Sequence, residues 1–229
     1  MPLSTPEDRW LQLSGMNARY WRCGSGPPLV LLHGIGGSLE AWHRNIPTLS
    51  TGYEVIALEL PGCGRTSAPP AYPQDMLGLF AHFVAAELDQ LGLDRVVLVG
   101  SSLGGAVAIE FALRFPQRMD ALVLVSSAGM STAVGWPLRF LAVPGLGEWM
   151  SRPSRISSAR SLRGIVADPA VITDDEIDAA YELAQLPGAQ RAFLSMLRVY
   201  CSFFGLRRSE IKRIVGGLSH IDAPVLLIW

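Results

Sequence analysis

The sequence predicts an α/β fold with a mainly parallel central sheet and flanking helices. Short apolar runs alternate with longer helical patterns along the 229 residues, as a parallel sheet with crossover helices requires. Two of these runs, Arg95 to Gly100 and Ala121 to Ser126, are rich in valine and leucine, which is typical of strands covered on both faces. Glycine, proline or aspartate bounds the runs, and these residues mark turns between elements.

The expected elements follow this alternation in order. Trp10 to Leu13 and Arg19 to Arg22 are interpreted as an edge hairpin that turns at Ser14-Gly15. The three- and four-residue spacing of apolar side chains predicts an amphipathic helix from Asp75 to Gly92. The remaining elements of this part are strands at Pro28 to Leu32 and Tyr53 to Leu60, and helices at Leu39 to Leu49 and Leu103 to Phe115.

The alternation of strand-like and helical patterns stops after Ser127, because the residues up to the strand-like run Pro224 to Trp229 have a helical pattern throughout. Thr173 and Glu176 have the spacing of a capping box ahead of a helix from Ile177 to Leu186, and Ala189 to Phe204 continues the helical pattern. We therefore expect three parts: the first part of the core at 1–128, an inserted helical cap at 129–219, and the core continued at 220–229 with a truncated seventh strand.

Composition excludes several classes of protein. Hydrophobic residues make up 49% and charged residues 17% of the chain, and the net charge is -1, so no overall field recruits nucleic acid or anionic lipid, and any such partner must be argued from a local site. No apolar run approaches the ~20 residues of a membrane span. The polar start lacks the pattern of a signal peptide, so the expected location is cytoplasmic. Three scattered cysteines suggest no metal site.

A candidate nucleophile stands where a predicted strand passes into a predicted helix. The sequence Gly100-Ser101-Ser102-Leu103-Gly104 matches the pattern G-x-S-x-G. A serine at such a sharp turn takes a strained backbone conformation, and glycines on either side let neighbouring chain approach it. Ser102 is therefore the predicted catalytic residue, and Gly100 and Gly104 are predicted to support its turn.

A second glycine-rich segment, His33-Gly34-Ile35-Gly36-Gly37, follows the strand Pro28 to Leu32 directly. A loop at this position can turn a backbone N–H toward the serine, and the amides of Ile35 and Leu103 would together form an oxyanion hole. His33 and Gly34 are expected to support this loop.

Three segments, taken in their order and spacing, resemble the α/β-hydrolase superfamily. They are HGIGG, then ELPGCGRTSAPP from Glu59 to Pro70, then GSSLGG. The resemblance covers nearly the whole chain. It implies a sheet of about eight strands, a lid after the sixth strand, and a triad in the order serine, acid, histidine. Glu59 stands where the family has aspartate and is expected to hold the following loop by hydrogen bonds.

The resemblance also implies an acid after the seventh strand and a histidine beyond it, and neither position falls within the 229 residues. His33, His43, His82 and His220 do not occupy the place of the family's histidine, and the acids of the cap, Asp168, Asp174, Asp175 and Asp178, are interpreted as charges at helix N-termini. We therefore expect this chain, as it stands, to be inactive.

The function indicated is a serine hydrolase that cleaves an ester or related carbonyl bond of a small, largely apolar substrate, without cofactor or metal. Esterases, carbon–carbon bond hydrolases, perhydrolases and acyltransferases all remain open, as does the oligomeric state. The apolar residues expected to roof the pocket are Trp136, Phe140, Leu141, Leu146, Trp149 and Met150. Arg152, Arg155, Arg160 and Arg163 are interpreted as a solvated helix face, with an anionic partner as the alternative. The rival function is a non-catalytic binding protein or a truncated pseudoenzyme.

Overall fold

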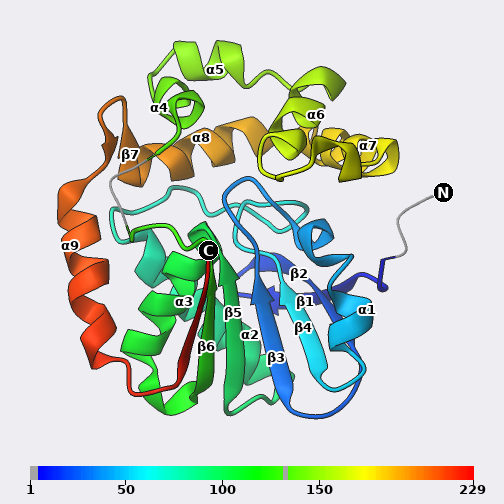
Figure 1. Cartoon of the computed structure of the whole chain (residues 1–229), viewed down its shortest axis with the longest axis vertical. Coiled ribbons are helices and arrows are strands. Elements are labelled where there is room, and N and C mark those ends of the chain that lie inside the picture. The colour runs from blue at the N-terminus through cyan, green and yellow to red at the C-terminus, as the bar shows by residue number, and fades with distance from the viewer. Residues whose placement is uncertain (1–4, 131–133) are drawn as a thin grey trace.

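A seven-stranded sheet organises the computed structural model, which describes residues 5–130 and 134–229 (Figure 1). The strand order is β1-β2-β4-β3-β5-β6-β9. β1 and β2 form an antiparallel hairpin, β2 pairs antiparallel with β4, and all later pairs are parallel. The bounds are β1 Arg9–Leu13, β2 Met16–Cys23, β3 Pro28–Leu32, β4 Glu54–Leu58, β5 Val96–Ser101, β6 Met119–Val125 and β9 Val225–Ile228.

Each face of the sheet has its own core because side chains alternate along the central strands. On β3, Val30 and Leu32 face the larger core, which is shared with α2 (Met76–Leu91), α3 (Leu103–Arg114) and Ile214. Leu29 and Leu31 face the smaller core on the opposite side. The face toward α2 and α3 is thus covered, whereas the opposite face is covered mainly over β3 and β4. Val97, Val123 and Val125 of β5 and β6 are only partly buried there, so the coverage of both faces that their apolar runs predict is incomplete.

The predicted helix Asp75 to Gly92 is confirmed as α2, and both of its ends have a local cause. The Asp75 carboxylate accepts a hydrogen bond from the Gly78 amide at 3.1 Å, which caps the N-terminus. Gly92 adopts the left-handed conformation at φ 69°, which ends the helix. α7 (Asp174–Ala184) begins at the predicted capping box, since Glu176 donates its amide to Thr173 and accepts from the Thr173 amide.

Two predicted helices were wrong in extent. Leu39 to Leu49 is not one helix but a 3₁₀ turn, η1 (Leu39–Trp42), and a short α1 (Ile46–Leu49). Pro47 explains the break, because a proline lacks the N–H of a helix interior and is tolerated in the first turn, where it lies here. Ala189 to Phe204 ends early: α8 covers Ala189–Tyr200, and Cys201 is already extended at the start of a small hairpin of β7 (Cys201–Ser202) and β8 (Gly205–Leu206).

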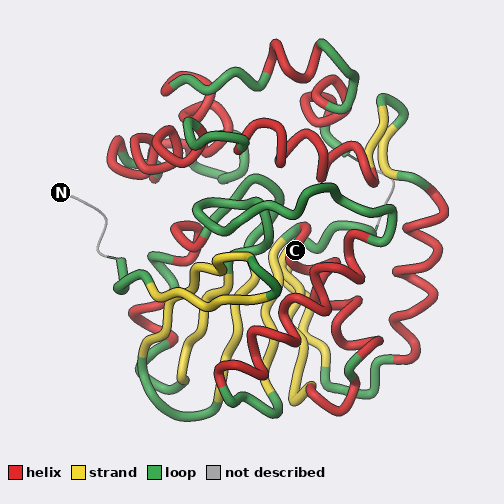
Figure 2. Tube along the Cα trace, turned by 180° about the vertical axis from the view of Figure 1, so that it is seen from behind, coloured by secondary structure: helices red, strands yellow, loops and turns green. Residues whose placement is uncertain are grey.

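A layer of helices lies over the carboxyl ends of the sheet strands (Figures 1 and 2). We call this the upper layer; it comprises α4 (Trp136–Leu141), α5 (Leu146–Met150), α6 (Arg155–Arg163), α7, α8 and the β7–β8 hairpin. α9 (Arg208–Gly217) follows this hairpin but packs along α3 beside the sheet, with Ile214 buried in the larger core. The range 129–219, predicted as a cap, therefore contains both the upper layer and α9.

The last strand differs from the others in exposure. β9 pairs with β6 from Leu122↔Val225 to Val125↔Ile228, and it is the seventh strand of the described sheet in chain order. All four of its side chains are exposed, and Trp229 beyond it is 81% exposed. Within the described residues, no helix is both long and apolar enough to cross a membrane.

Candidate active site

Three loops meet where the central strands end. Leu32 at the end of β3 pairs with Leu58 on one side and with Gly100 on the other. The residues that follow these three strands therefore lie along one edge of the sheet, which is where open α/β sheets bind ligands. The sequence-predicted residues Ser102, Ile35 and Glu59 come from these three loops.

Ser102 sits between β5 and α3 in a conformation that few residues other than glycine adopt. Its φ is 51° and its ψ is −114°, so the turn stores backbone strain. Surrounding hydrogen bonds hold it there: the Ser102 amide donates to the Val125 carbonyl at 3.0 Å, and the Ser102 carbonyl accepts from the Ala128 amide at 2.9 Å. The sharp bend expected at this residue is present.

The glycines on either side are required by close packing. A Cβ on Gly100 would overlap the Gly104 carbonyl, and one on Gly104 would overlap the Leu32 carbonyl. Both contacts are with backbone, which cannot move aside as a flexible side chain can. These two positions therefore allow the first turn of α3 to pack against the ends of β5 and β3.

The loop after β3 lies directly against the serine. A Cβ on Gly34 would be 3.2 Å from the Ser102 Cβ and 3.7 Å from its Oγ. In the described part of the chain, the amides of Ile35 and Leu103 donate to no other group, and the half-buried Ser102 hydroxyl makes no hydrogen bond. Free amides and a free hydroxyl at one place can stabilise a developing negative charge next to a nucleophile.

His33 is fully buried beneath this loop and makes two hydrogen bonds. Its Nε2 accepts from the Leu60 amide at 3.1 Å, so its Nδ1 must carry the proton, which it donates to the Gly34 carbonyl at 2.8 Å. Burial lowers the pKa of His33 to about 4. The ring is therefore neutral at physiological pH and connects the loop after β3 to the loop after β4.

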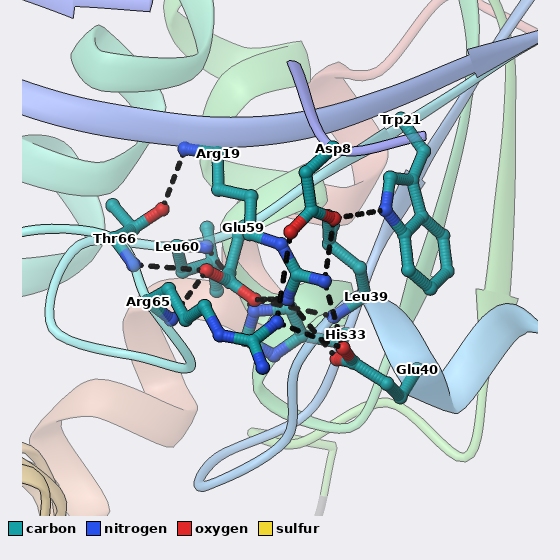
Figure 3. Close-up of polar contacts among 10 residues, drawn as sticks. All are labelled: Asp8, Arg19, Trp21, His33, Leu39, Glu40, Glu59, Leu60, Arg65 and Thr66. Atoms are coloured by element: carbon teal, nitrogen blue, oxygen red, sulfur yellow. Dashed lines mark hydrogen bonds and ion pairs between the residues drawn. The ribbon is translucent and has the colours of Figure 1, made fainter. Parts of the chain in front are cut away.

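Glu59 holds the loop after β4, as predicted (Figure 3). Its Oε2 accepts from the amides of Arg65 at 2.8 Å and Thr66 at 2.9 Å. Its Oε1 accepts from the Arg19 guanidinium at 3.2 Å. The Glu59 side chain is fully buried, and these contacts fix the start and the end of the segment between them.

Arg19 is the centre of a buried ionic cluster that the sequence analysis did not find. From β2 it reaches Asp8 at 2.7 Å, Glu40 at 2.8 Å and Glu59, with only 2% of its side chain exposed (Figure 3). Burial alone would raise the pKa of Glu40, but hydrogen bonds from Arg19 and Ser38 outweigh it and the pKa lies below its ordinary value. For Glu59, burial dominates and raises the pKa despite Arg19.

Helix α8 of the upper layer rests on these loops. The Phe193 ring lies so close to Gly36 that a Cβ there would be 3.0 and 3.2 Å from two ring carbons. Gly36 has a φ of 65°. Phe193 and Ile35 both pack against one apolar cluster of the upper layer, formed by Ala142, Leu197 and Cys201. The loop that contains the Ile35 amide is therefore enclosed by the upper layer on one side and by Ser102 on the other.

The other predicted roof residues lie farther out. Of the six apolar side chains named for the cap, Leu141 joins the cluster with Ile35. The other five are exposed: Trp136, Phe140, Leu146, Trp149 and Met150.

None of the four histidines forms a hydrogen bond with Ser102. Besides the buried His33, His43 lies against Glu40 and Glu176, His82 bonds the Gly78 carbonyl within α2, and His220 lies next to Ser219 before β9. Of the acids predicted as helix N-terminal charges, Asp174 and Asp178 pair with Arg155. Among the described residues, no group of three His, Cys, Asp or Glu side chains is arranged to hold a metal ion.

Comparison with known proteins agrees with this architecture. The model of the alpha/beta hydrolase fold matches residues 27–152. The 2-hydroxy-6-oxo-2,4-heptadienoate hydrolase of Pseudomonas putida is 34% identical over 192 residues, covering 82% of this chain and 66% of that protein. The dihydrolipoyllysine-residue acetyltransferase component of the acetoin cleaving system of Pseudomonas putida is 30% identical over 221 residues, covering 96% of this chain and 54% of that protein.

Among solved structures, the meta-cleavage product hydrolase of Pseudomonas fluorescens IP01 superposes with a TM-score of 0.75 at 28% identity, covering 96% of this chain and 78% of that one. The chain thus spans about two thirds of the length of the first of these curated relatives and about half of the second. Because the family model covers more than half of the residues, and the strained serine turn lies within the matched range, the chain belongs to the α/β-hydrolase fold family.

Proposed function

We propose that this chain carries the nucleophile and oxyanion hole of a serine hydrolase that acts on a small, largely apolar carbonyl compound. The observation that carries the proposal is the backbone of Ser102, held at φ 51° at the end of β5 with Gly34 against its side chain. Strain of this kind persists only where surrounding structure imposes it, and it gathers at sites of chemistry.

In the proposed reaction, the Ser102 Oγ adds to the carbonyl carbon while a base takes its proton. The carbonyl oxygen becomes an oxyanion that accepts hydrogen bonds from the Ile35 and Leu103 amides. Collapse of the adduct breaks the bond to the leaving group, which takes up the proton. Water then attacks the acyl-serine and releases a carboxylic acid.

The class of substrate is argued from two relatives. The names 2-hydroxy-6-oxo-2,4-heptadienoate hydrolase and meta-cleavage product hydrolase describe hydrolases, and the first names a substrate with a ketone but no ester or amide bond. Both favour a carbon–carbon bond next to a ketone as the bond broken here. Ile35, Leu138, Leu141 and Phe193 pack against one apolar cluster of the upper layer, and this apolar surface suits the hydrocarbon part of such a compound. We infer that the upper layer acts as its cap.

Acyl transfer is the second candidate, supported by the similarity to the acetyltransferase component over 96% of this chain. It would use the same acyl-serine, with a thiol or an alcohol in place of water. The products separate the two: a hydrolase releases the free acid, whereas a transferase yields a thioester or an ester when the acceptor is present.

Chemical rescue provides the test. Since no histidine hydrogen-bonds to Ser102, the chain alone is expected to turn over p-nitrophenyl acetate no faster than Ser102→Ala. Added imidazole supplies the missing base and should restore hydrolysis that depends on Ser102. The rate with imidazole is measured for the unmodified chain, for Ser102→Ala and for the neighbouring control Ser101→Ala.

The proposal expects the unmodified chain and Ser101→Ala to exceed Ser102→Ala by about tenfold in the presence of imidazole. Equal rates for all three proteins would remove the hydrolase assignment and leave the non-catalytic rival. Serine-dependent turnover without imidazole would instead show that the expected inactivity of this chain is wrong.

A further inference from the structure

Four aromatic side chains gather on one corner of the upper layer, away from Ser102. Trp136 and Phe140 come from α4, and Phe203 and Phe204 from the loop of the β7–β8 hairpin. Their ring centroids lie 5.7 to 6.4 Å apart in a connected series. Trp136 is 60% and Phe204 88% exposed. We call these four residues the aromatic patch.

The hairpin loop is an unusual place for aromatic residues. Cys201 pairs with Leu206 and Ser202 with Gly205, so Phe203 and Phe204 are the two residues of the loop itself. Two-residue loops favour asparagine and glycine for their backbone conformation, and a side chain at the tip has little protein surface to bury against. Phe203 packs on Trp136 and Phe140, whereas Phe204 leaves most of its apolar surface available to a partner.

Positive charge surrounds the aromatic patch. The Arg139 guanidinium lies 4.8 Å from the centre of the Trp136 ring. Arg207 and Arg208 follow the hairpin, are both exposed, and form no ion pair with any described residue. Between residues 121 and 167 the sequence contains one acid, Glu148, and this acid is paired with Arg198 at 2.7 Å.

We propose that the aromatic patch attaches this protein to the surface of an anionic phospholipid bilayer, with the rings at headgroup depth and the arginines on lipid phosphates. Exposed Trp and Phe next to Arg form the combination that binds the boundary between lipid headgroups and acyl chains. The β7–β8 hairpin protrudes from the upper layer (Figure 1), and a protruding tip can enter a deformable bilayer.

The positive charge around the aromatic patch favours an anionic bilayer over a second copy of the chain as its partner. A symmetric dimer through the aromatic patch would place the same surface on both sides of the interface. Arg139, Arg207 and Arg208 would then face their own copies without an unpaired acid in the patch to compensate. An anionic lipid surface supplies the opposite charge. The inference does not depend on the proposed hydrolase activity, because no patch residue touches the serine turn.

Vesicle sedimentation tests the proposal. The chain is mixed with vesicles of about one part phosphatidylglycerol to three parts phosphatidylcholine, and with vesicles of phosphatidylcholine alone. We expect binding to the anionic vesicles that weakens at high salt, and binding to the neutral vesicles that is at least about tenfold weaker. Phe203→Ser with Phe204→Ser, and separately Arg207→Gln with Arg208→Gln, should each reduce binding by about tenfold or more.

Matched controls come from another part of the same layer. Ile156→Ser with Ile165→Ser removes two apolar side chains that are 74% and 80% exposed, and Arg160→Gln with Arg163→Gln removes the same charge. Both controls should bind as the unmodified chain does. The single variant Phe204→Ser provides the same test where the double variant does not fold.

Three results would overturn the proposal. One is the absence of binding to anionic vesicles, and a second is an equal loss of binding in the patch variants and in the controls. The third is a dimer, measured by light scattering, that the phenylalanine variants convert to a monomer while no protein sediments with vesicles. That outcome would assign the aromatic patch to a second copy of the chain.

Discussion

Arg19 and Arg155 each bind more than one carboxylate, in very different surroundings. Arg19 lies in the core, 2% exposed, between Asp8, Glu40 and Glu59. Arg155 lies at the start of α6, 48% exposed, and bridges to Asp174 and Asp178 on α7. The distances are similar, so burial sets the difference. A buried pair leaves an uncompensated charge when one partner is removed, whereas water replaces an exposed partner.

The two arginines therefore have different structural roles. The Arg19 cluster ties β2, η1 and the loop after β4 together, while Arg155 connects two helices of the upper layer. The following four predictions test this contrast between core and surface.

The largest effect is expected for Glu59→Ala. This change leaves Arg19 with less compensation and removes the acceptor for the Arg65 and Thr66 amides. We expect the free energy of unfolding to fall by about 3–5 kcal/mol, measured by urea titration with tryptophan fluorescence. Glu59→Gln keeps the side-chain volume and one oxygen acceptor and should lose less. A loss no greater than that of Arg155→Ala would contradict the contrast.

His33 should make the free energy of unfolding decrease at acid pH. Its folded pKa of about 4 lies below the ordinary 6.5, so below pH 6.5 the unfolded chain binds a proton that the folded chain does not. The free energy of unfolding should thus decrease by about 3 kcal/mol as the pH falls from 7 to 4. Urea titrations across this range are compared with His33→Gln, which should lack this part of the slope. An identical slope in both proteins would rule out the buried neutral ring.

Glu87 should have the opposite dependence. It is fully buried in α2, neither of its oxygens has a hydrogen-bond partner among the described residues, and burial raises its pKa well above 4.5. Because the unfolded carboxyl ionises first, stability should decrease as the pH rises above 4.5. At pH 8, Glu87→Met should stabilise the fold by about 1–3 kcal/mol.

Glu87→Gln serves as the matched variant, since it removes the titration but leaves a polar group without a partner. Urea titrations of all three proteins at pH 5 and pH 8 measure both effects. A destabilised Glu87→Met variant would mean that the carboxyl has a partner after all.

The smallest effect is expected for Arg155→Ala. Its pairs with Asp174 and Asp178 are exposed and screened by salt, so the melting temperature should change by no more than the scatter between replicate melts. A decrease comparable to that of Glu59→Ala would show that the upper layer depends on these pairs.

The sequence predicts most of the sheet and the serine turn because their signals are local. Apolar runs predict β3, β5 and β6. The glycines among residues 100–104 predict that neighbouring backbone packs closely against the serine turn, and the structure shows these contacts. The sequence also predicts that Glu59 holds the loop after β4 by hydrogen bonds, because the carboxylate and the amides of Arg65 and Thr66 lie in one short segment.

The Arg19 cluster could not be predicted, since its members are spread over residues 8 to 59 and meet only after the sheet has formed. Arg19 reads in sequence as an ordinary strand residue. For the residues of the β7–β8 hairpin the sequence predicts helix, because the apolar residues up to Phe204 continue the helical spacing of α8. Its local signal was Gly205, whose φ of 105° no helix contains.

The contact of Phe193 with Gly36 has a consequence for how a ligand could be selected. With a ring seated on the backbone next to Ile35, helix α8 and the loop cannot shift independently. Under the proposed mechanism, a substrate that pushes Phe193 aside would also displace the Ile35 amide, which is proposed to bind the oxyanion. The size of the substrate would then affect the turnover rate as well as the binding affinity. Replacing Phe193 by a smaller residue should weaken the size dependence of both quantities.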